Sequence, residues 1–395
     1  MSSSKRIFLK PGKERPIERF HPWIFSGAIA RFDETPKDGE LVQVLSSKGV
    51  FLASGHYQDS SIAVRLISFV EEDIDADFWF RKIQAAWQYR KDVGYLDNPN
   101  TNCYRLIHAE GDGLPGLIID IYAQTAVIQC HSIGMFRSRK EIAEALRKIY
   151  GDQLSAIYDK SSETLPSEFG RGVQNGFLEG AGDSAIVQEH QHQFLVDWVQ
   201  GQKTGFFLDQ RDNRQMLSQY VSGKSVLNAF CYSGGFSVYA LAAGARMVHS
   251  VDVSEKAIAW TDRNVALNKL PEDRHKSMAE DVMKYLKDTE ESYEVMVVDP
   301  PAFAKSLKKR HNAVQAYKRL NAMALAKIAP GGILFTFSCS QVVDRSLFYD
   351  TIVAAAIEAG RSVRVMSSLS QPADHPVQLF HSESRYLKGL ILYVE

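Results

Sequence analysis

From about residue 191 to residue 395, short apolar segments alternate with longer helical patterns, and this alternation constrains the fold most strongly. Segments such as 224–230 (KSVLNAF) and 293–301 (YEVMVVDPP) are strand-like, whereas 254–270 (SEKAIAWTDRNVALNKL) has helical periodicity. Apolar strands that alternate with helices indicate a doubly wound, mostly parallel sheet covered on both faces. We therefore expect an α/β domain over residues 191–395.

The chain before residue 191 has a different rhythm. Residues 41–46, 50–57 and 62–69 are short, β-branched segments separated by turn residues, and the acidic run 71–77 follows them. These features predict an all-β domain over residues 1–72.

Residues 73–190 are predicted to form a small central α+β domain with a linker. The pattern predicts helices over 77–94 and 135–150, paired strands over 114–122 and 125–132, and a further strand over 154–161. Residues 161–184 are rich in Gly and Ser, so we expect a loop or linker there.

The composition is that of a globular protein, with 45% hydrophobic residues, 24% charged residues and a net charge of −1. Residues 1–31 carry seven Lys or Arg against two acids, and residues 300–320 carry six and no acid. Such segments indicate a localised polyanion site or, alternatively, two solvated loops. The four cysteines include no C-x-x-C pair, so we expect reduced thiols and no metal site. Without an apolar signal-peptide core or a membrane-length apolar run, we expect a cytoplasmic protein with no membrane partner.

Open α/β sheets bind ligands beyond the carboxyl ends of their strands. After the first strand, Gly234 and Gly235 allow a tight turn into a helix. Asp252 follows the second strand, where a carboxylate can bind a ribose diol; Ser254 is the better helix cap, which leaves Asp252 without a structural role. Asp281 follows a short third segment and could meet an adenine amino group, cap a helix or simply be a surface acid.

The fourth strand ends in Asp299-Pro300-Pro301, a rigid turn that presents Asp299 at the expected cleft. Together these features resemble the class I S-adenosylmethionine-dependent methyltransferases over residues 191–395, a Rossmann-like fold whose last strand is antiparallel. The resemblance implies S-adenosylmethionine as cofactor. It also implies the following cofactor-binding residues: Asn228, Phe230, Ser233, Gly234, Asp252, Asp281 and Asp299.

Motifs along nearly the whole chain are similar to those of one family. They are HPWIFSGAI (21–29), GDGLPGLIID (111–120), KTGFFLDQRDNR (203–214), FSCS (337–340) and DHPV (374–377). The chain resembles the bacterial large-subunit (23S) ribosomal RNA cytosine-C5 methyltransferases, which have an N-terminal PUA domain. The resemblance implies an N-terminal PUA-like RNA-binding domain, ribosomal RNA as partner and a homodimer. One departure is Ala302, where the family usually has a lysine.

Methylation of cytosine C5 requires a nucleophile because C5 itself reacts poorly with a methyl sulfonium. A thiolate that adds to C6 makes C5 nucleophilic, and the thiolate leaves after the C5 proton has been removed. Cys339 lies at the end of the fifth strand, which should place it opposite Asp299, and we expect it to be the nucleophile. A helix N-terminus or the donor's positive charge could increase its thiolate fraction. Asp299 would hold the base at N3 and the exocyclic amine.

Two points stay open around this predicted site. Cys231 is the competing nucleophile, although its place in the cofactor turn favours packing or cofactor lining. No second cysteine follows the fourth strand, so another base or water must remove the proton.

The target base must be single-stranded or flipped out of a helix. We expect the basic segment to hold phosphates, and Trp23 to stack on RNA, whereas Phe25 fits better in a small β core. The predicted RNA-binding residues are Lys305, Lys308, Lys309, Arg310 and Trp23. The alternatives are an RNA methyltransferase acting on guanine N7 or an exocyclic amine, and a non-catalytic RNA-binding assembly factor.

Overall fold

The computed structural model describes residues 5–304 and 306–395, and Lys305, one of the predicted RNA-binding residues, lies outside this part. The chain divides into two compact units. Unit 1 comprises Met1–Val187, Val196–Phe206 and Ala373–Ser384, and unit 2 comprises Gln188–Leu195, Phe207–Pro372 and Arg385–Glu395. The segment Ala373–Ser384 thus belongs to unit 1, although it lies within the range 191–395 that was predicted to be one contiguous domain. The limits 1–72, 73–190 and 191–395 stay a prediction.

Unit 1 begins with a six-stranded sheet in the order β2-β6-β5-β4-β1-β3. Its small core is aliphatic and includes Ile7, Val42 and Val64. The elements are β1 (Lys5–Leu9), α1 (Arg15–Glu18), β2 (Trp23–Phe25), η1 (Ser26–Ala28), β3 (Ile29–Phe32), β4 (Leu41–Leu45), β5 (Phe51–Tyr57) and β6 (Ile62–Ser68). The expected strands β4 to β6 are present, whereas the short strands β1 to β3 were missed. Phe25 is 50% exposed, so its predicted place in the core is wrong.

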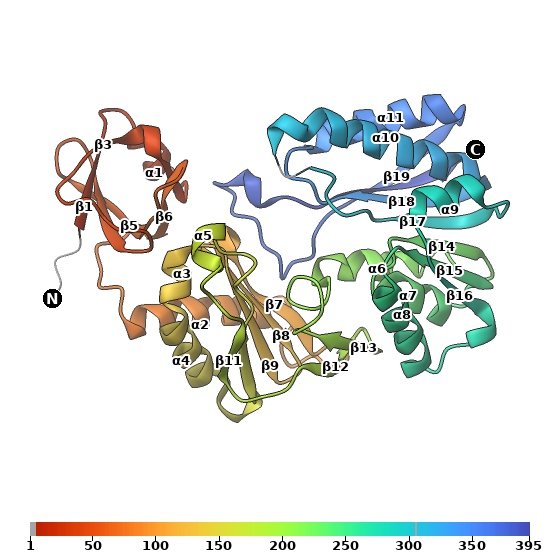
Figure 1. Cartoon of the computed structure of the whole chain (residues 1–395), viewed down its shortest axis with the longest axis horizontal. Helices are drawn as coiled ribbons and strands as arrows, with labels where there is room; N and C mark the ends of the chain where they lie inside the picture. The colour runs from red at the N-terminus through yellow and green to blue at the C-terminus, as the bar shows by residue number, and fades with distance from the viewer. Residues whose placement is uncertain (1–4, 305) are drawn as a thin grey trace. The chain divides into compact units, whose positions relative to one another are not determined.

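The second part of unit 1 is a five-stranded sheet in the order β11-β10-β9-β8-β7, with α2 and α4 packed together beside it (Figure 1). The predicted pair of strands is confirmed as the antiparallel hairpin β8–β9. The elements are α2 (Ala76–Asp92), β7 (Cys103–His108), η2 (Ala109–Asp112), β8 (Leu117–Tyr122), β9 (Thr125–Cys130), α3 (Ile133–Arg137), α4 (Arg139–Tyr150), η3 (Gly151–Gln153), β10 (Ala156–Asp159), α5 (Ser167–Gly170) and β11 (Gly176–Glu179).

Two details of the central region differ from the sequence analysis. The single helix expected over 135–150 is divided into α3 and α4 at Ser138. The expected loop over 161–184 contains α5 and β11, because β11 completes its hydrogen bonds by antiparallel pairing with β10. Such pairing is non-local, so the Gly- and Ser-rich composition concealed it.

A hairpin of β12 (Ser184–Glu189) and β13 (His192–Asp197) contributes residues to both units. Unit 2 is built on a seven-stranded sheet in the order β16-β15-β14-β17-β18-β20-β19. Strands β14 to β18 pair with one another in parallel, and β20 is antiparallel to β18 and β19. This confirms the doubly wound sheet and its antiparallel last strand.

Helices cover both faces of this sheet, with α6 to α8 on one side and α9 to α11 on the other (Figure 1). The remaining elements are η4 (Leu208–Gln210), α6 (Arg211–Leu217), β14 (Ser225–Ala229), α7 (Gly235–Ala242), β15 (Met247–Asp252), α8 (Glu255–Leu267), η5 (Glu272–Arg274), β16 (His275–Ala279), α9 (Val282–Asp288), β17 (Tyr293–Val298), η6 (Leu307–Lys309), α10 (Arg310–Lys327), β18 (Ile328–Ser338), α11 (Arg345–Ala359), β19 (Val363–Leu369), η7 (Ser382–Ser384) and β20 (Lys388–Val394). Strands β14, β17 and β18 are almost wholly buried, which explains their continuous apolar sequences.

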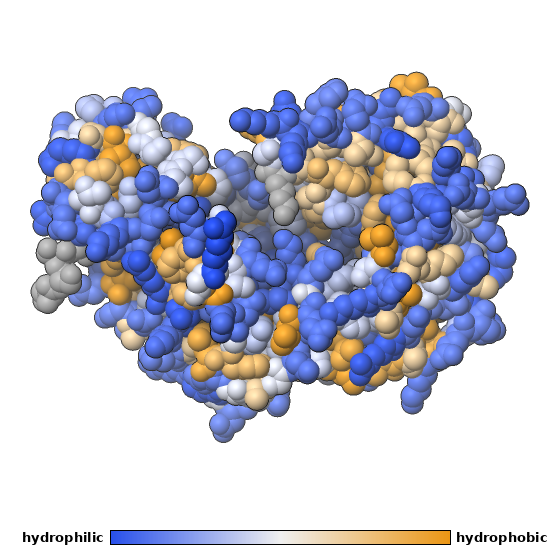
Figure 2. Space-filling view, in the orientation of Figure 1, coloured by the Kyte–Doolittle hydropathy of each residue, from blue (hydrophilic) through white to orange (hydrophobic). Residues whose placement is uncertain are grey.

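Polar residues predominate on the face shown in Figure 2, between smaller apolar patches. No helix in the described part of the chain is long and apolar enough to cross a membrane.

Candidate active site

The turn between β14 and α7 has an unusual backbone. Phe230 and Tyr232 have positive φ angles of 62° and 49°, and Gly234, which precedes α7, has φ 77°. A Cβ atom at Gly234 would lie 2.6 Å from Thr261 Cγ2, so glycine is required for both conformation and space. Strained turns of this kind occur at ligand sites, and this one brings backbone N–H groups of the start of α7 to the end of β14.

The turn contains a buried polar atom that a ligand could satisfy. Ser233 is 4% exposed, and its Oγ has no hydrogen-bond partner among the residues described. Asn264 instead binds the Ser233 carbonyl at 2.8 Å. The orphaned hydroxyl and the glycine turn are therefore compatible with a cofactor at this end of the sheet.

Asn228 and Phe230 both pack into the interior of unit 2, Asn228 fully and Phe230 in part. The Asn228 side chain is 1% exposed and donates to Ser237 Oγ at 2.8 Å, within a buried network. Phe230 is partly buried against the core of unit 2. Cys231 is buried, and this burial raises the pKa of its thiol to about 12. The structure thus favours packing for Cys231.

Asp252 has a structural role, contrary to the expectation from sequence. Its Oδ2 accepts a hydrogen bond from the Tyr232 N–H at 3.0 Å, and its Oδ1 accepts one from the Ser254 N–H at 3.0 Å. The side chain therefore holds the turn after β14 against the end of β15. Each carboxylate oxygen has a second lone pair, so a ribose diol can still bind. Ser254 caps α8 as predicted, through the Ala257 N–H.

Asp281 is the N-cap of α9 and accepts a hydrogen bond from the Lys284 N–H at 2.8 Å. The cap was one of the three roles left open for this residue. The side chain is exposed just beyond the end of β16, so capping and cofactor binding are compatible.

Cys339 directly follows β18, and β18 pairs with β17 as expected from the fold. Its Sγ lies 4.0 Å from the Pro300 carbonyl oxygen, in the Asp299-Pro-Pro turn, and the residue is half-buried. The flanking serines are fully buried, and Ser340 donates to the Ala304 carbonyl at 2.8 Å. Ser340 therefore ties the loop after the prolines to the position of the thiol.

Two carboxyl groups act on this thiol. Burial and the neighbouring Asp209 raise the pKa of Asp299 to about 7. Burial, Asp299 and Asp209 together raise the pKa of Cys339 to about 12. Without substrate the thiol is therefore protonated, and the expected increase in its thiolate fraction is not present in the protein alone.

Asp209 and Gln210, from the KTGFFLDQR motif, lie beside Asp299, although the sequence did not reveal their roles. Gln210 Nε2 donates to Asp299 Oδ2 at 2.9 Å, and Asn213 Nδ2 in turn donates to Gln210 Oε1 at 2.6 Å. Tyr386 donates to Asp209 Oδ2 at 2.6 Å, whereas Asp209 Oδ1 is buried and lacks a hydrogen-bond partner in the described part of unit 2. The motif thus orients one carboxyl group and supplies another.

Two arginines of the same motif form buried ion pairs that hold the motif in place. Arg211 and Arg214 are both buried and pair with the buried carboxylate of Glu189, the latter through two hydrogen bonds of 2.8 Å. This ion-pair network holds α6 to the hairpin and so fixes the position of Gln210 at the helix start.

Lys388 is the other residue that sequence reasoning missed. It is 4% exposed, and its Nζ donates to the carbonyl oxygens of Ser340 and Tyr386, both at 2.7 Å. Burial lowers the pKa of Lys388 to about 8, and its charge acts to lower the pKa of Cys339. The only signal was its place at the start of the last strand, which pairs Lys388 with Ser338.

A cavity of about 470 Å³ adjoins Lys388. It is lined by Arg345, Ser346, Phe348, Tyr349, Ser368, Lys388, Gly389 and Leu390. Of Cys339 and the residues described around it (Asp209, Asp299, Ser340 and Lys388), only Lys388 lines this cavity. We therefore do not place the cofactor there.

The predicted RNA-binding residues differ in exposure. Lys308, Lys309 and Arg310 are exposed at the start of α10. Trp23 is half-buried, and its indole N–H donates to Glu110 at 2.9 Å. Phe20 and Phe25 are the exposed aromatic residues of this region, at 53% and 50%.

Comparisons with known proteins agree with this architecture. Residues 7–69 match the PUA-like domain family, and residues 178–384 match the S-adenosylmethionine-dependent methyltransferase family. A solved Streptococcus mutans protein named as a SAM-dependent methyltransferase has a TM-score of 0.84 at 23% identity, covering 98% of this chain and 99% of that chain. A methyltransferase solved in complex with SAH has a TM-score of 0.85, also at 23% identity and with the same coverage. These structures show the fold.

The sequence relatives show more than the fold. The ribosomal RNA large subunit methyltransferase I of Aeromonas hydrophila is 40% identical over 98% of this chain and 99% of its own. That of Shewanella frigidimarina is 41% identical over the same shares. The cofactor is S-adenosylmethionine, and the chain belongs to the ribosomal RNA large subunit methyltransferase I family of S-adenosylmethionine-dependent methyltransferases.

Proposed function

We propose that this protein forms 5-methylcytosine in large-subunit ribosomal RNA through a covalent adduct of Cys339. The observation that carries the proposal is the thiol at the end of β18, with its Sγ 4.0 Å from the Pro300 carbonyl and two carboxyl groups acting on it. Methylation of guanine N7 or of an exocyclic amine has no use for a thiol at this place. The names of the relatives support ribosomal RNA as the substrate.

S-adenosylmethionine supplies the methyl group as a positively charged sulfonium. We assign its adenosine to the end of the sheet where Gly234, Ser233 and Asp252 lie, with Asp281 beside it. The other predicted residues of this site, Asn228, Phe230 and Asp299, complete the proposal. Asp252 already holds the turn, so its free lone pairs are presented in a fixed direction.

The Cys339 thiol gives up its proton to water, the resulting thiolate adds to C6 of the flipped cytosine, and this addition makes C5 nucleophilic. Burial raises the pKa of Asp299 to about 7, so the carboxyl group can carry a proton at neutral pH. A protonated Asp299, oriented by Gln210, donates to N3 and stabilises the adduct. The raised pKa of Asp299 thus allows this residue to donate a proton to the base at neutral pH.

Asp209 is our candidate for the base that the sequence left open. After C5 has been methylated, the Asp209 carboxylate takes the C5 proton, the C5–C6 double bond re-forms, and the C6–S bond breaks with Cys339 leaving as thiolate. N3 then returns its proton to the Asp299 carboxylate, which gives neutral 5-methylcytosine. The buried Oδ1 of Asp209 has no hydrogen-bond partner among the described residues, while Tyr386 orients Oδ2. A carboxylate held in this way acts as a base without losing an existing contact.

Lys388 provides the countercharge for the thiolate. It is held by two carbonyl oxygens, so it acts through its positive charge rather than by reaching the base. Its effect opposes that of the two carboxyl groups on the pKa of Cys339. We assign it as a positioning residue for the ionised state.

RNA is held, in this proposal, by the exposed basic residues Lys308, Lys309 and Arg310 of unit 2. Phosphate contacts of this kind supply affinity that falls with salt. The PUA-like domain and Trp23 form a second RNA contact, and the homodimer stays a prediction for sedimentation measurements.

Bisulfite sequencing of ribosomal RNA from a deletion strain tests the function. We expect one cytosine to lose its protection and to regain it when the gene is restored. Purified protein should also form a denaturant-resistant complex with RNA that carries 5-fluorocytidine at that position. An intact bisulfite pattern together with a lost methyl group on a guanine would overturn the proposal.

A further inference from the structure

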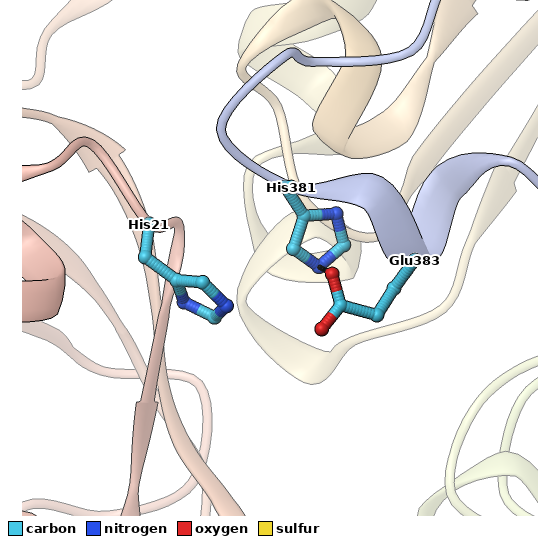
Figure 3. A group of neighbouring side chains, drawn as sticks. All are labelled: His21, His381 and Glu383. Atoms are coloured by element: carbon cyan, nitrogen blue, oxygen red, sulfur yellow. Dashed lines mark ion pairs between the residues drawn. The ribbon is translucent and has the colours of Figure 1, made fainter.

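Three metal-ligating side chains meet in unit 1, away from the methyltransferase site. His21 precedes β2, while His381 and Glu383 lie in the segment Ala373–Ser384 (Figure 3). One ligand atom from each residue lies within 4.8 Å of the other two. All three belong to unit 1, so their arrangement is a feature of that unit.

His381 points a buried, unused nitrogen into this group. The residue is 1% exposed, and its Nε2 has no hydrogen-bond partner within the described residues. Glu383 Oε2 is 3.6 Å from Nε2, which is close enough for an ion pair when His381 is protonated but beyond hydrogen-bond distance. A buried polar atom without a partner is costly, so a ligand at Nε2 would remove a penalty.

The other nitrogen of each ring is already occupied. His381 Nδ1 lies 3.0 Å from Ser384 Oγ, and His21 Nδ1 lies 3.2 Å from the Trp23 carbonyl oxygen and 3.2 Å from the Trp23 nitrogen. Metal-ligating histidines typically hold their second nitrogen in this way, which orients the free one. Figure 3 shows the His21 ring extending toward His381 and Glu383.

We propose that His21, His381 and Glu383 bind one divalent transition-metal ion of the zinc type, with water as a further ligand. Two imidazoles and one carboxylate suit zinc and its neighbours, whereas calcium and magnesium prefer oxygen ligands. Bonds of about 2.1 Å in a tetrahedral site separate ligand atoms by roughly 3.4 Å, so the group must contract slightly. Glu383, whose side chain is 54% exposed, has the freedom to make that movement.

The ion would fasten the segment Ala373–Ser384 at its far end. At its near end, Asp374 is already held to the central region: its carbonyl accepts from Arg90 at 2.8 Å, and its Oδ2 accepts from the Arg105 N–H at 3.0 Å. A metal at His381 would tie the other end to the β domain through His21. The sequence offered no metal pattern because these ligands lie at opposite ends of the chain.

Trp23 offers a probe of this site, because its ring centroid lies 4.3 Å from that of His381. The full-length protein is first freed of metal with a chelator and then titrated with Zn²⁺ or Co²⁺. Calorimetry measures the stoichiometry for either ion, and tryptophan fluorescence follows the binding of Co²⁺. We expect one equivalent to bind, Co²⁺ to quench fluorescence, and no thiolate-to-cobalt charge-transfer band. Trp23→Phe should remove most of the quenching while leaving the stoichiometry unchanged.

Variants locate the ion. His381→Ala, His21→Ala and Glu383→Gln should each weaken binding at least tenfold, whereas His311→Ala, which alters an exposed histidine on α10, should leave it unchanged. Since His381 is buried and its variant could misfold, the half-buried His21 and the exposed Glu383 keep the test decisive. Absence of stoichiometric binding, or binding that survives His21→Ala and Glu383→Gln, would overturn the proposal.

Discussion

The two regions of unit 2 to which we assign cofactor binding and chemistry are built in opposite ways. The turn after β14 is held by local backbone contacts: Asp252 accepts two N–H groups, and Gly234 packs against Thr261. The end of β18 instead gathers a thiol, two carboxyl groups and an ammonium group in buried surroundings. The first region is complete before a ligand arrives, whereas the second holds charges that oppose one another. In our proposal, cofactor binding uses the preformed turn, and the chemistry uses groups whose protonation a substrate can change.

The largest expected effect separates the two regions directly. Cys339→Ala should lower methyl transfer by roughly 10³-fold or more, because the covalent step is lost. Calorimetry should show unchanged affinity for S-adenosylmethionine, since the turn after β14 is untouched. Full activity in this variant would refute covalent catalysis by Cys339.

Asp209→Asn should slow turnover by about 10² to 10⁴-fold, the usual range for loss of a general base. The asparagine oxygen can still accept the hydrogen bond from Tyr386. Because addition and methylation remain possible, a covalent complex with unmodified RNA should accumulate on denaturing gels. Asp299→Asn is the control and should form little adduct. If the Asp209→Asn enzyme turned over without a trapped adduct, water rather than Asp209 would be the base that removes the C5 proton.

Asp252→Ala tests the preformed region. It removes the proposed ribose acceptor and two hydrogen bonds from backbone N–H groups, so we expect S-adenosylmethionine affinity to fall about 10- to 100-fold and stability to fall by about 1–3 kcal/mol. Calorimetry and urea unfolding measure the two effects. Asp273→Ala changes an exposed acid and should alter neither. Unchanged affinity would show that the residue only supports the turn.

Lys388→Met sharpens the electrostatic part of the comparison. Removing the ammonium group should raise the pKa of the Cys339 thiol further; below that pKa, each unit of increase lowers the thiolate fraction about tenfold. The rate of Cys339 alkylation, measured by peptide mass spectrometry across pH 7 to 9, should therefore fall. Asp299→Asn should act oppositely and speed alkylation, most clearly above pH 7, where Asp299 is ionised. Equal rates in both variants would contradict the assigned charges.

The smallest effect concerns Asp281, which has two roles in our proposal. Serine caps helices as well as aspartate does but is shorter. Asp281→Ser should keep the cap of α9 and the midpoint of thermal unfolding, while weakening S-adenosylmethionine binding only a few-fold. Unchanged binding would leave the cap as the only role of this side chain.

Much of this architecture was visible in the amino-acid pattern because it depends on local periodicity. The strand–helix alternation predicted the parallel sheet, and the neighbouring places of the fourth and fifth strands put Cys339 beside the Asp299-Pro-Pro turn. The strand β11 was not predicted because its backbone pairing with β10 and the ion pair of Glu179 with Arg147 are long-range contacts. Phe25 was misplaced because a β-strand gives an aromatic residue two faces, and pattern alone chose the buried one.

The groups of the proposed active site and of the proposed metal site come from segments far apart in the sequence. Gln210 meets Asp299, Lys388 meets Ser340, and His381 meets His21 only after the chain has folded. The raised pKa values of Asp299 and Cys339 follow from burial, which no local pattern reports. Local sequence thus sets which strands and turns form, whereas desolvation and long-range contacts set which protons those residues hold.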